Sequence, residues 1–265
     1  MMLRDTRKSK DYFNALLPQY LEGIENLHHA LDDGSMPLPD EQTFVANDIF
    51  ELTLMYTIAC YSAGEPLQAL KPKVAEILKA KKLYFEKAAT LPARQQVYRE
   101  QFEKMSGKSE AGETHYITRY INVLWWLSLA VTTQQPQDHC LEILSCIGNR
   151  GEDTLLDRIA IALGDENQIL APNLLYPHLY RPLLSAFDAS PSQQIMYVNA
   201  FLKDWYSNCW QAAWYNNHNK ENAEGGNWDF YFGYWSLEAA LVANLLNVDT
   251  TSFKDHWHYP ADMSL

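Results

Sequence analysis

The chain has 265 residues, of which 47% are hydrophobic, and a formal net charge of -12. A chain of this size and composition can bury a full core, either as one large domain or as two packed ones. It has no apolar run of about 20 residues, the length that a membrane-spanning helix needs, so a transmembrane protein is excluded. No apolar signal segment follows the charged N-terminus, and a cytoplasmic location is therefore expected.

The charge is concentrated in the second part of the chain. Residues 109–265 contain 7 Lys and Arg against 18 Asp and Glu, whereas residues 1–108 contain 14 against 15. This asymmetry argues against nucleic acid or an anionic membrane as a direct partner of the second part. It favours a basic partner, although solubility alone would also account for it.

Apolar residues recur at helical spacing through the first part of the chain. Helices are expected over residues 11–31, 43–62, 74–88 and 92–104. The third of these is rich in lysine, and Lys79, Lys81 and Lys82 are expected on a solvated face because no glycine loop accompanies them. Glu25 and His28 have the spacing of one half of a di-iron ligand set, but no second such pair exists, so no metal site is expected.

A segment rich in Gly, Ser and Glu, 105–114, is the best candidate for a linker. It divides the chain into an N-terminal helical region, 1–108, and an acidic C-terminal helical region, 109–265. Further helices are expected over 115–131, 138–147, 153–163 and from the Ser190 cap to about 216. Between the last two, Pro177 and Pro182 predict broken helical turns instead of one helix.

The stretch 228–260 is the element around which the rest of the chain is organised. Its middle, 234–246, places Leu and Ala at helical spacing and is nearly apolar all round, which is typical of a buried helix. Glu238 is the exception, because a carboxylate inside such a run must find hydrogen-bond donors or face a groove. No window of alternating β-branched residues indicates a strand. The predicted fold is all-α, a compact multi-helix bundle with a buried, aromatic-rich C-terminal helix.

Motifs for catalysis are absent from the sequence. It has no nucleophile elbow, P-loop, dinucleotide-binding glycine motif or zinc-protease motif, so neither an enzyme nor a cofactor is expected. His256 and His258 with Asp255 make at most half of a metal site, and a structural cluster is favoured. The four cysteines form no C-x-x-C pair and are expected as buried free thiols.

Three C-terminal segments resemble the signature of a known family. They read GYWSLEAALVA (233–243), VDTTSF (248–253) and HWHYPAD (256–262), and they resemble the C-terminal signature of PoNi proteins, the immunity partners of polymorphic nuclease (PoNe) toxins. Thr250 and Trp257 depart from the family pattern, which leaves the identity of the toxin open. The matching positions, interpreted as structural, include Gly233, Tyr234, Trp235, Glu238, Asp249, His256, Tyr259 and Pro260.

The resemblance implies an immunity protein that binds its cognate DNase toxin during competition between bacteria and inactivates it. Such a toxin would arrive by a contact-dependent route of the type VI kind. Because a DNase is basic where it holds phosphate, an acidic inhibitor can occupy that surface. The candidate contacts are acids in the loops and helix ends of the second part: Glu110, Glu113, Glu152, Asp153, Asp157, Asp165, Glu166, Glu221 and Glu224.

Two alternatives from other classes remain open. One is an α-helical enzyme in which Glu238, His256 and Asp255 line a pocket, although no nucleophile or complete metal set accompanies them. The other is a helical ligand-binding scaffold or sensor with an unrelated partner. A nuclease-like reading frame directly upstream would favour immunity, whereas a metabolic operon would favour the enzyme.

Overall fold

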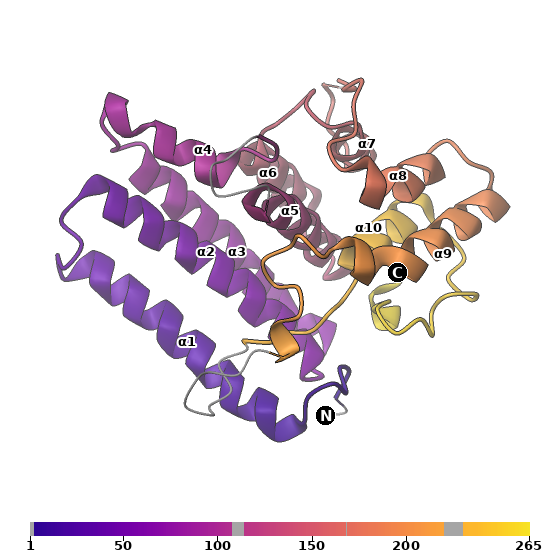
Figure 1. The fold of residues 1–265 in the computed structure, drawn as a ribbon, viewed down its shortest axis with the longest axis horizontal. Coiled ribbons are helices and arrows are strands. Elements are labelled where there is room, and N and C mark those ends of the chain that lie inside the picture. The colour runs from indigo at the N-terminus through magenta and orange to yellow at the C-terminus, as the bar shows by residue number, and fades with distance from the viewer. Residues whose placement is uncertain (1–2, 108–113, 168, 220–229) are drawn as a thin grey trace. The chain divides into compact units, whose positions relative to one another are not determined.

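The chain folds into helices and connecting loops (Figure 1). The computed structural model describes residues 3–107, 114–167, 169–219 and 230–265, and within these ranges it contains ten α-helices and no strand. The all-α prediction is therefore confirmed. The chain divides into two compact units: unit 1 is 1–103 with 216–233, and unit 2 is 104–215 with 234–265. Unit 1 thus includes a segment that follows the expected linker, and a domain boundary at residue 108 stays a prediction.

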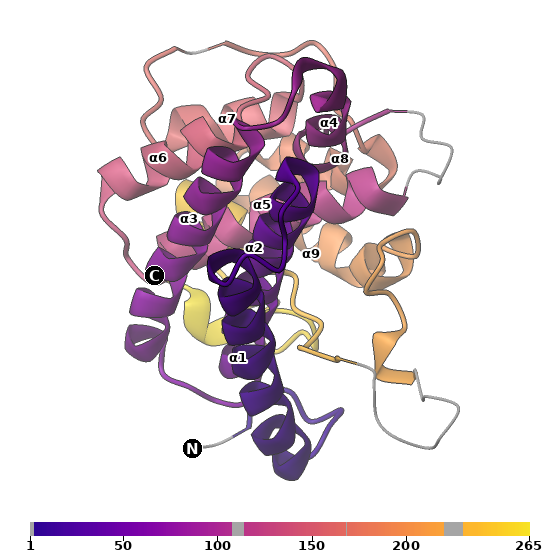
Figure 2. The ribbon, with the colours of Figure 1, turned by 90° about the vertical axis from the view of Figure 1, so that its left-hand side faces the viewer.

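Unit 1 is built on three long helices that follow one another in the chain (Figure 2). α1 packs against α2, and α2 packs against α3. The helix α2 begins four residues earlier than its expected start, because proline suits a first helical position and the Glu41 carboxylate accepts a hydrogen bond from the Leu38 amide. The elements are α1 (Lys10–Asp32), α2 (Pro39–Ser62), α3 (Leu67–Ala88), η1 (Ala93–Gln95), α4 (Val97–Glu103) and η2 (Asn217–Asn219).

One lysine of α3 departs from the solvated face that the sequence predicts. Lys81 is only 7% exposed, so the expectation was wrong for this residue. Its ammonium lies 4.1 Å from the ring centroid of Tyr84, 4.8 Å from that of Phe50 and 5.3 Å from that of Phe85. The negative faces of aromatic rings attract a cation and offset part of the lost hydration, which is why this lysine can be buried.

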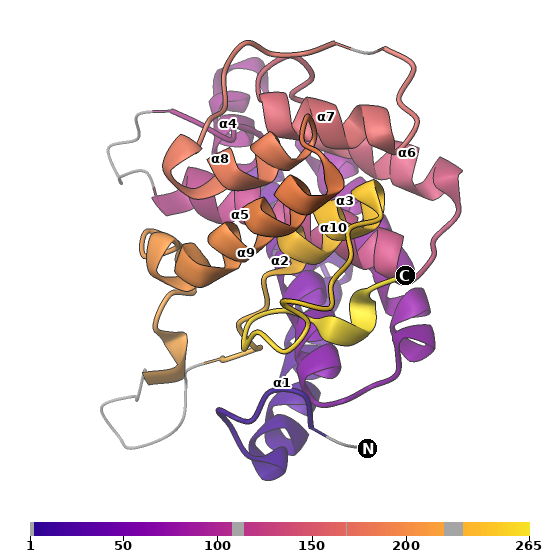
Figure 3. The same ribbon diagram turned by 90° about the vertical axis from the view of Figure 1, so that its right-hand side faces the viewer.

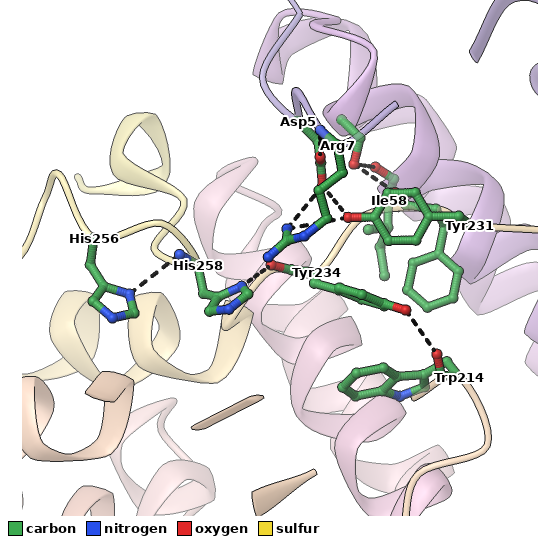
Figure 4. Close-up of polar contacts among 10 residues, drawn as sticks. Asp5, Arg7, Ile58, Trp214, Tyr231, Tyr234, His256 and His258 are labelled. Atoms are coloured by element: carbon green, nitrogen blue, oxygen red, sulfur yellow. Dashed lines mark hydrogen bonds and ion pairs between the residues drawn. The ribbon is translucent and has the colours of Figure 1, made fainter. Parts of the chain in front are cut away.

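The segment 230–233 is held within unit 1 by hydrogen bonds to the start of the chain and to α2. The Tyr231 hydroxyl donates to Asp5 (Figure 4), and the Tyr231 amide donates to the Tyr12 hydroxyl at 2.7 Å. The hydroxyl of Ser62, at the end of α2, donates to the Phe232 carbonyl at 2.6 Å. Residues about 220 positions apart are therefore part of one folded unit.

Unit 2 contains the other six α-helices of the described ranges (Figure 3). α10 packs against α5, and α8 packs against α9. Residues 237–243, the first seven of α10, are all buried, so the buried C-terminal helix is confirmed. The elements are α5 (Thr114–Thr132), α6 (Gln137–Ile147), α7 (Thr154–Ala162), α8 (Pro177–Ala186), α9 (Pro191–Asn208), α10 (Leu237–Leu246) and η3 (Ala261–Met263).

Three boundaries in unit 2 differ from the expected ones. α8 is one helix, because Pro177 occupies a first-turn position where no amide hydrogen is needed and the single interior proline, Pro182, is tolerated. α9 ends at Asn208 and does not reach residue 216. α10 starts three residues later than expected, at Leu237, and the Ser236 amide just before it donates to the His258 carbonyl at 2.8 Å.

None of the helices in the described ranges combines the length and the apolarity that crossing a membrane requires.

Candidate functional site

The core of unit 2 is organised around one buried carboxylate, Glu238, in the first turn of α10. The indole N–H groups of Trp125 and Trp205 donate to its two oxygens at 2.8 and 2.7 Å, and the Tyr180 hydroxyl donates at 3.2 Å. All four side chains are completely buried. The donors come from α5, α9 and α8, so four helices meet at a single carboxyl group.

Burial dominates the protonation of this group. Removal from water disfavours the charged form and raises the pKa of Glu238 to about 7, even though the bonds from Trp205, Trp125 and Tyr180 favour that form. Glu238 is therefore partly protonated at neutral pH. Because it has no solvent exposure and its oxygens are bonded to core residues, it does not line a surface pocket.

A second buried carboxylate, Asp153, caps α7 and continues this network. The Tyr120 ring lies 5.0 Å from that of Tyr180, and the Tyr120 hydroxyl donates to Asp153 at 2.8 Å. Asp153 also accepts from the amides of Leu156, at 2.9 Å, and Leu175, at 2.7 Å. Burial raises the pKa of Asp153, while these hydrogen bonds oppose the shift. The side chain thus fixes both the start of α7 and the segment that leads into α8.

A third buried acid, Asp157, joins the two loops that flank α7. Its carboxylate accepts from the Gly151 amide at 3.0 Å and from the Ala171 amide at 2.8 Å. Asp165, also buried, forms a 2.7 Å ion pair with Arg150, which connects the same two loops. Asp153, Asp157 and Asp165 are therefore bonded within the chain, and their side chains are not exposed at the surface.

The two loops that flank α7 also carry exposed side chains, two of them acidic and two apolar. Ile169 and Leu170 are 50% and 47% exposed, and Glu152 and Glu166 are exposed as well. Ile169 lies over Gly151, where an added Cβ would be 3.2 Å from its methyl group, so the two loops meet here. We call Glu152, Glu166, Ile169 and Leu170 the acidic loop patch. The remaining candidate contacts, Glu110, Glu113, Glu221 and Glu224, lie outside the described residues.

The family-signature residues mostly shape the chain before and after α10. Gly233 has φ of +114°, a conformation that favours glycine. Tyr234 is buried, with its hydroxyl directed to the Trp214 carbonyl, and its own carbonyl accepts from the His258 ring at 2.9 Å (Figure 4). Trp235 and Pro260 are buried too.

The last residues of the signature hold the C-terminal segment together. Tyr259 is buried with its ring 4.9 Å from that of Phe253, and its hydroxyl lies 3.0 Å from that of Ser264. Asp249 is exposed and accepts from the Thr251 amide at 2.9 Å, which fixes a turn. His256 is half-buried, and burial lowers its pKa by disfavouring the charged ring.

The described residues offer no complete site for catalysis on a metal. No group of three or more His, Cys, Asp or Glu in these ranges could hold a metal ion. Asp255 is exposed whereas Glu238 is completely buried, so the two do not line one pocket. Three cysteines are buried and Cys146 is half-buried, all as free thiols.

These observations define an all-α protein with a core of bonded carboxylates and an exposed acidic loop patch. Residues 151–263 match the family model described as PoNe immunity proteins (PoNi), C-terminal. The resemblance found in the sequence is confirmed over these residues, which include the whole acidic loop patch. The family description implies immunity to a nuclease toxin and suggests a role without catalysis.

The fold is also known from a solved structure. Protein PA2201 from Pseudomonas aeruginosa has a TM-score of 0.68 and 15% sequence identity to this chain, with coverage of 98% of this chain and 89% of that chain. A likeness at this identity shows a shared fold. No curated protein matches the chain in sequence.

Proposed function

We propose that this protein binds a cognate bacterial DNase toxin in the cytoplasm and neutralises it. The observation that carries the proposal is the match of residues 151–263 to PoNi immunity proteins. The acidic balance of residues 109–265, with 18 acids against 7 bases, supports it independently. A DNase must present basic groups to phosphate, and an acidic protein can compete for that surface.

The acidic loop patch is the docking surface that we propose. Its two exposed apolar side chains can be desolvated at the centre of an interface, while Glu152 and Glu166 face basic groups of the nuclease. The buried acids Asp153 and Asp157 hold the supporting loops in one conformation, which lowers the entropic cost of binding. Inhibition of this kind needs no chemistry, only occupation of the surface that the DNA would use.

A growth assay tests the function. The nuclease encoded beside this gene is expressed in the cytoplasm of a sensitive bacterium, with or without this protein, and we expect growth to be restored only when both are present. A catalytically inactive form of the nuclease should bind the purified protein in a stable complex. Loss of viability despite normal levels of this protein, together with no complex, would refute the proposal.

Delivery by a type VI system is part of the proposal and is tested separately. Competition between strains that do or do not carry this gene should show dependence on a functional secretion system in the attacker. Protection during direct expression combined with no such dependence would retain the immunity function and reject this delivery route.

A further inference from the structure

Unit 1 contains a cavity of about 430 Å³ that the function proposed above does not use. It lies over α2, which supplies Ile49 and Tyr56, and between α1 and α3, which each pack against α2. Leu21 and Ile24 form the wall on α1, and Leu83 contributes to the wall on α3. A volume of this size is within the range of small-molecule sites, which are mostly apolar with few polar groups.

The apolar part of the cavity is elongated along the helices. Leu21 and Ile24 are about one turn apart on α1, and Ile49 and Tyr56 are about two turns apart on α2, a distance of roughly 10 Å at the rise of an α-helix. Leu21 is 42% exposed, whereas Ile49 is 1% exposed, so the walls extend from solvent to the core. An aliphatic chain placed along α2 would cover apolar surface on both sides.

The charged groups that line the cavity are two lysines, Lys73 and Lys79, and one acid, Glu76. Lys73 is paired with Glu65 at 2.9 Å and is about a quarter exposed, so its charge is largely used within the chain. Lys79 is paired with Glu76 at 2.7 Å, but both side chains are more than half exposed, and an exposed pair of this kind contributes little. The Lys79 ammonium can therefore turn to an anion in the cavity.

The overall charge of α3 also favours an anionic ligand. α3 carries six lysines and two glutamates, although the chain as a whole has a net charge of -12. A basic helix beside an apolar cavity is complementary to a molecule with an apolar body and a negative end.

We propose that this cavity binds a small amphiphile with one aliphatic chain and an anionic head group, of the fatty-acid class. The chain lies against Leu21, Ile24 and Ile49, and the head group lies beside Lys79. This site shares no residue with the acidic loop patch, and its occupation does not depend on a nuclease partner.

Calorimetric titration of the intact protein with decanoate, below the concentration at which it forms micelles, tests the proposal. We expect one saturable site. Butanoate has the same head group without the long chain, and decyltrimethylammonium has the chain with a positive head group. Both should bind at least about tenfold more weakly, because each lacks one of the two interactions. Equal affinity for the cation, or no saturable binding of decanoate, would overturn the proposal.

Three variants assign the binding to this cavity. Leu21→Trp places a larger ring at a partly exposed wall position and should abolish decanoate binding. Lys79→Glu should weaken it roughly fivefold, as expected for reversal of one exposed charge. Lys82→Glu makes the same charge reversal on α3 at a residue that does not line the cavity. It should leave the affinity for decanoate unchanged. Unchanged binding by both folded variants, Leu21→Trp and Lys79→Glu, would refute the assignment. Circular dichroism and thermal melting check that each variant is folded.

Discussion

The indole N–H of Trp205 donates a 2.7 Å hydrogen bond to Glu238, and both side chains are completely buried although they lie 33 residues apart. The bond joins α9 to α10. With the bonds from Trp125 and Tyr180, it places the carboxylate at the meeting point of four helices. A buried polar group of this kind stabilises a fold only when all of its partners are present.

Replacement of Glu238 by Leu is the first test of this arrangement. The leucine has no acceptor, so the two indoles and the Tyr180 hydroxyl lose their partner in a place that water does not reach. We expect the free energy of unfolding to fall by about 3 kcal/mol, since each unsatisfied buried donor costs on the order of 1 kcal/mol or more. Urea denaturation followed by tryptophan fluorescence measures the change.

Tyr180→Phe is the matched control, because it removes only the longest of the three bonds and keeps the ring. This variant should lower the free energy of unfolding by about 1 kcal/mol. If the Glu238→Leu variant melts like the original protein and yet no longer binds the nuclease, Glu238 is a contact residue and its structural role is refuted.

The raised pKa of Glu238 predicts a pH dependence of stability. An unperturbed glutamate titrates near 4.5, while burial raises the pKa of Glu238 in the folded protein to about 7. Between these values the folded state binds more protons than the unfolded one, so this residue's contribution to stability falls as pH rises. In total, the contribution of Glu238 to the free energy of unfolding falls by about 3 kcal/mol over this range, at 1.36 kcal/mol per pKa unit.

The variant Glu238→Gln isolates this effect, because glutamine does not titrate. The difference in unfolding free energy between the original protein and the variant should decrease from pH 4.5 to pH 7 and stay constant above that. A difference that is independent of pH over this range would contradict the raised pKa.

Helical periodicity predicted most of the helices because each buries an apolar stripe that its own sequence contains. It could not predict the donors to Glu238. Periodicity shows that Trp125 faces inward, but not that it meets a carboxylate 113 residues away. The same limit applies to the acids: from the sequence alone, Asp157 and Glu152 are both acids near a helix start. Only the fold shows that Asp157 accepts hydrogen bonds from two backbone amides, whereas Glu152 is exposed.

Asp157 is expected to control the conformation of the loops that carry the acidic loop patch. In Asp157→Asn, one of the two accepting oxygens becomes a donor that faces a backbone N–H, so the Gly151 or Ala171 amide loses its bond. We expect hydrogen exchange at one of these two amides to accelerate by about tenfold or more, the effect of losing about 1.4 kcal/mol of local stability. Nuclear magnetic resonance can follow each amide.

Asp188→Asn is the control for this experiment. Asp188 is exposed and pairs with Arg158 at 2.9 Å, so its replacement changes the same charge without touching the loop amides. Equal exchange at Gly151 and Ala171 in both variants would mean that Asp157 does not hold the loops.

The charge of the acidic loop patch leads to a prediction for the rate of nuclease binding. In the double variant Glu152→Lys with Glu166→Lys, two exposed acids become bases, while the buried acids that shape the loops stay intact. Exposed charges at an interface act mainly on diffusional encounter, so the association rate should fall by about tenfold at low salt. The difference should shrink as ionic strength rises, because screening shortens the range of the charges. Stopped-flow mixing with a catalytically inactive nuclease measures both effects.

Glu22→Lys with Glu25→Lys is the matched control, because it makes the same change of net charge at two exposed positions of α1 in unit 1. If steering depended on total charge alone, both double variants would slow association equally. If Glu152 and Glu166 face basic groups of the nuclease, only the double variant at these two residues should associate slowly with it. Equal effects would leave the acidic loop patch without support as the docking surface, even if the growth assay shows immunity. A replacement of Leu170 by Ser then separates the apolar contribution, since loss of a desolvated side chain raises the dissociation rate instead.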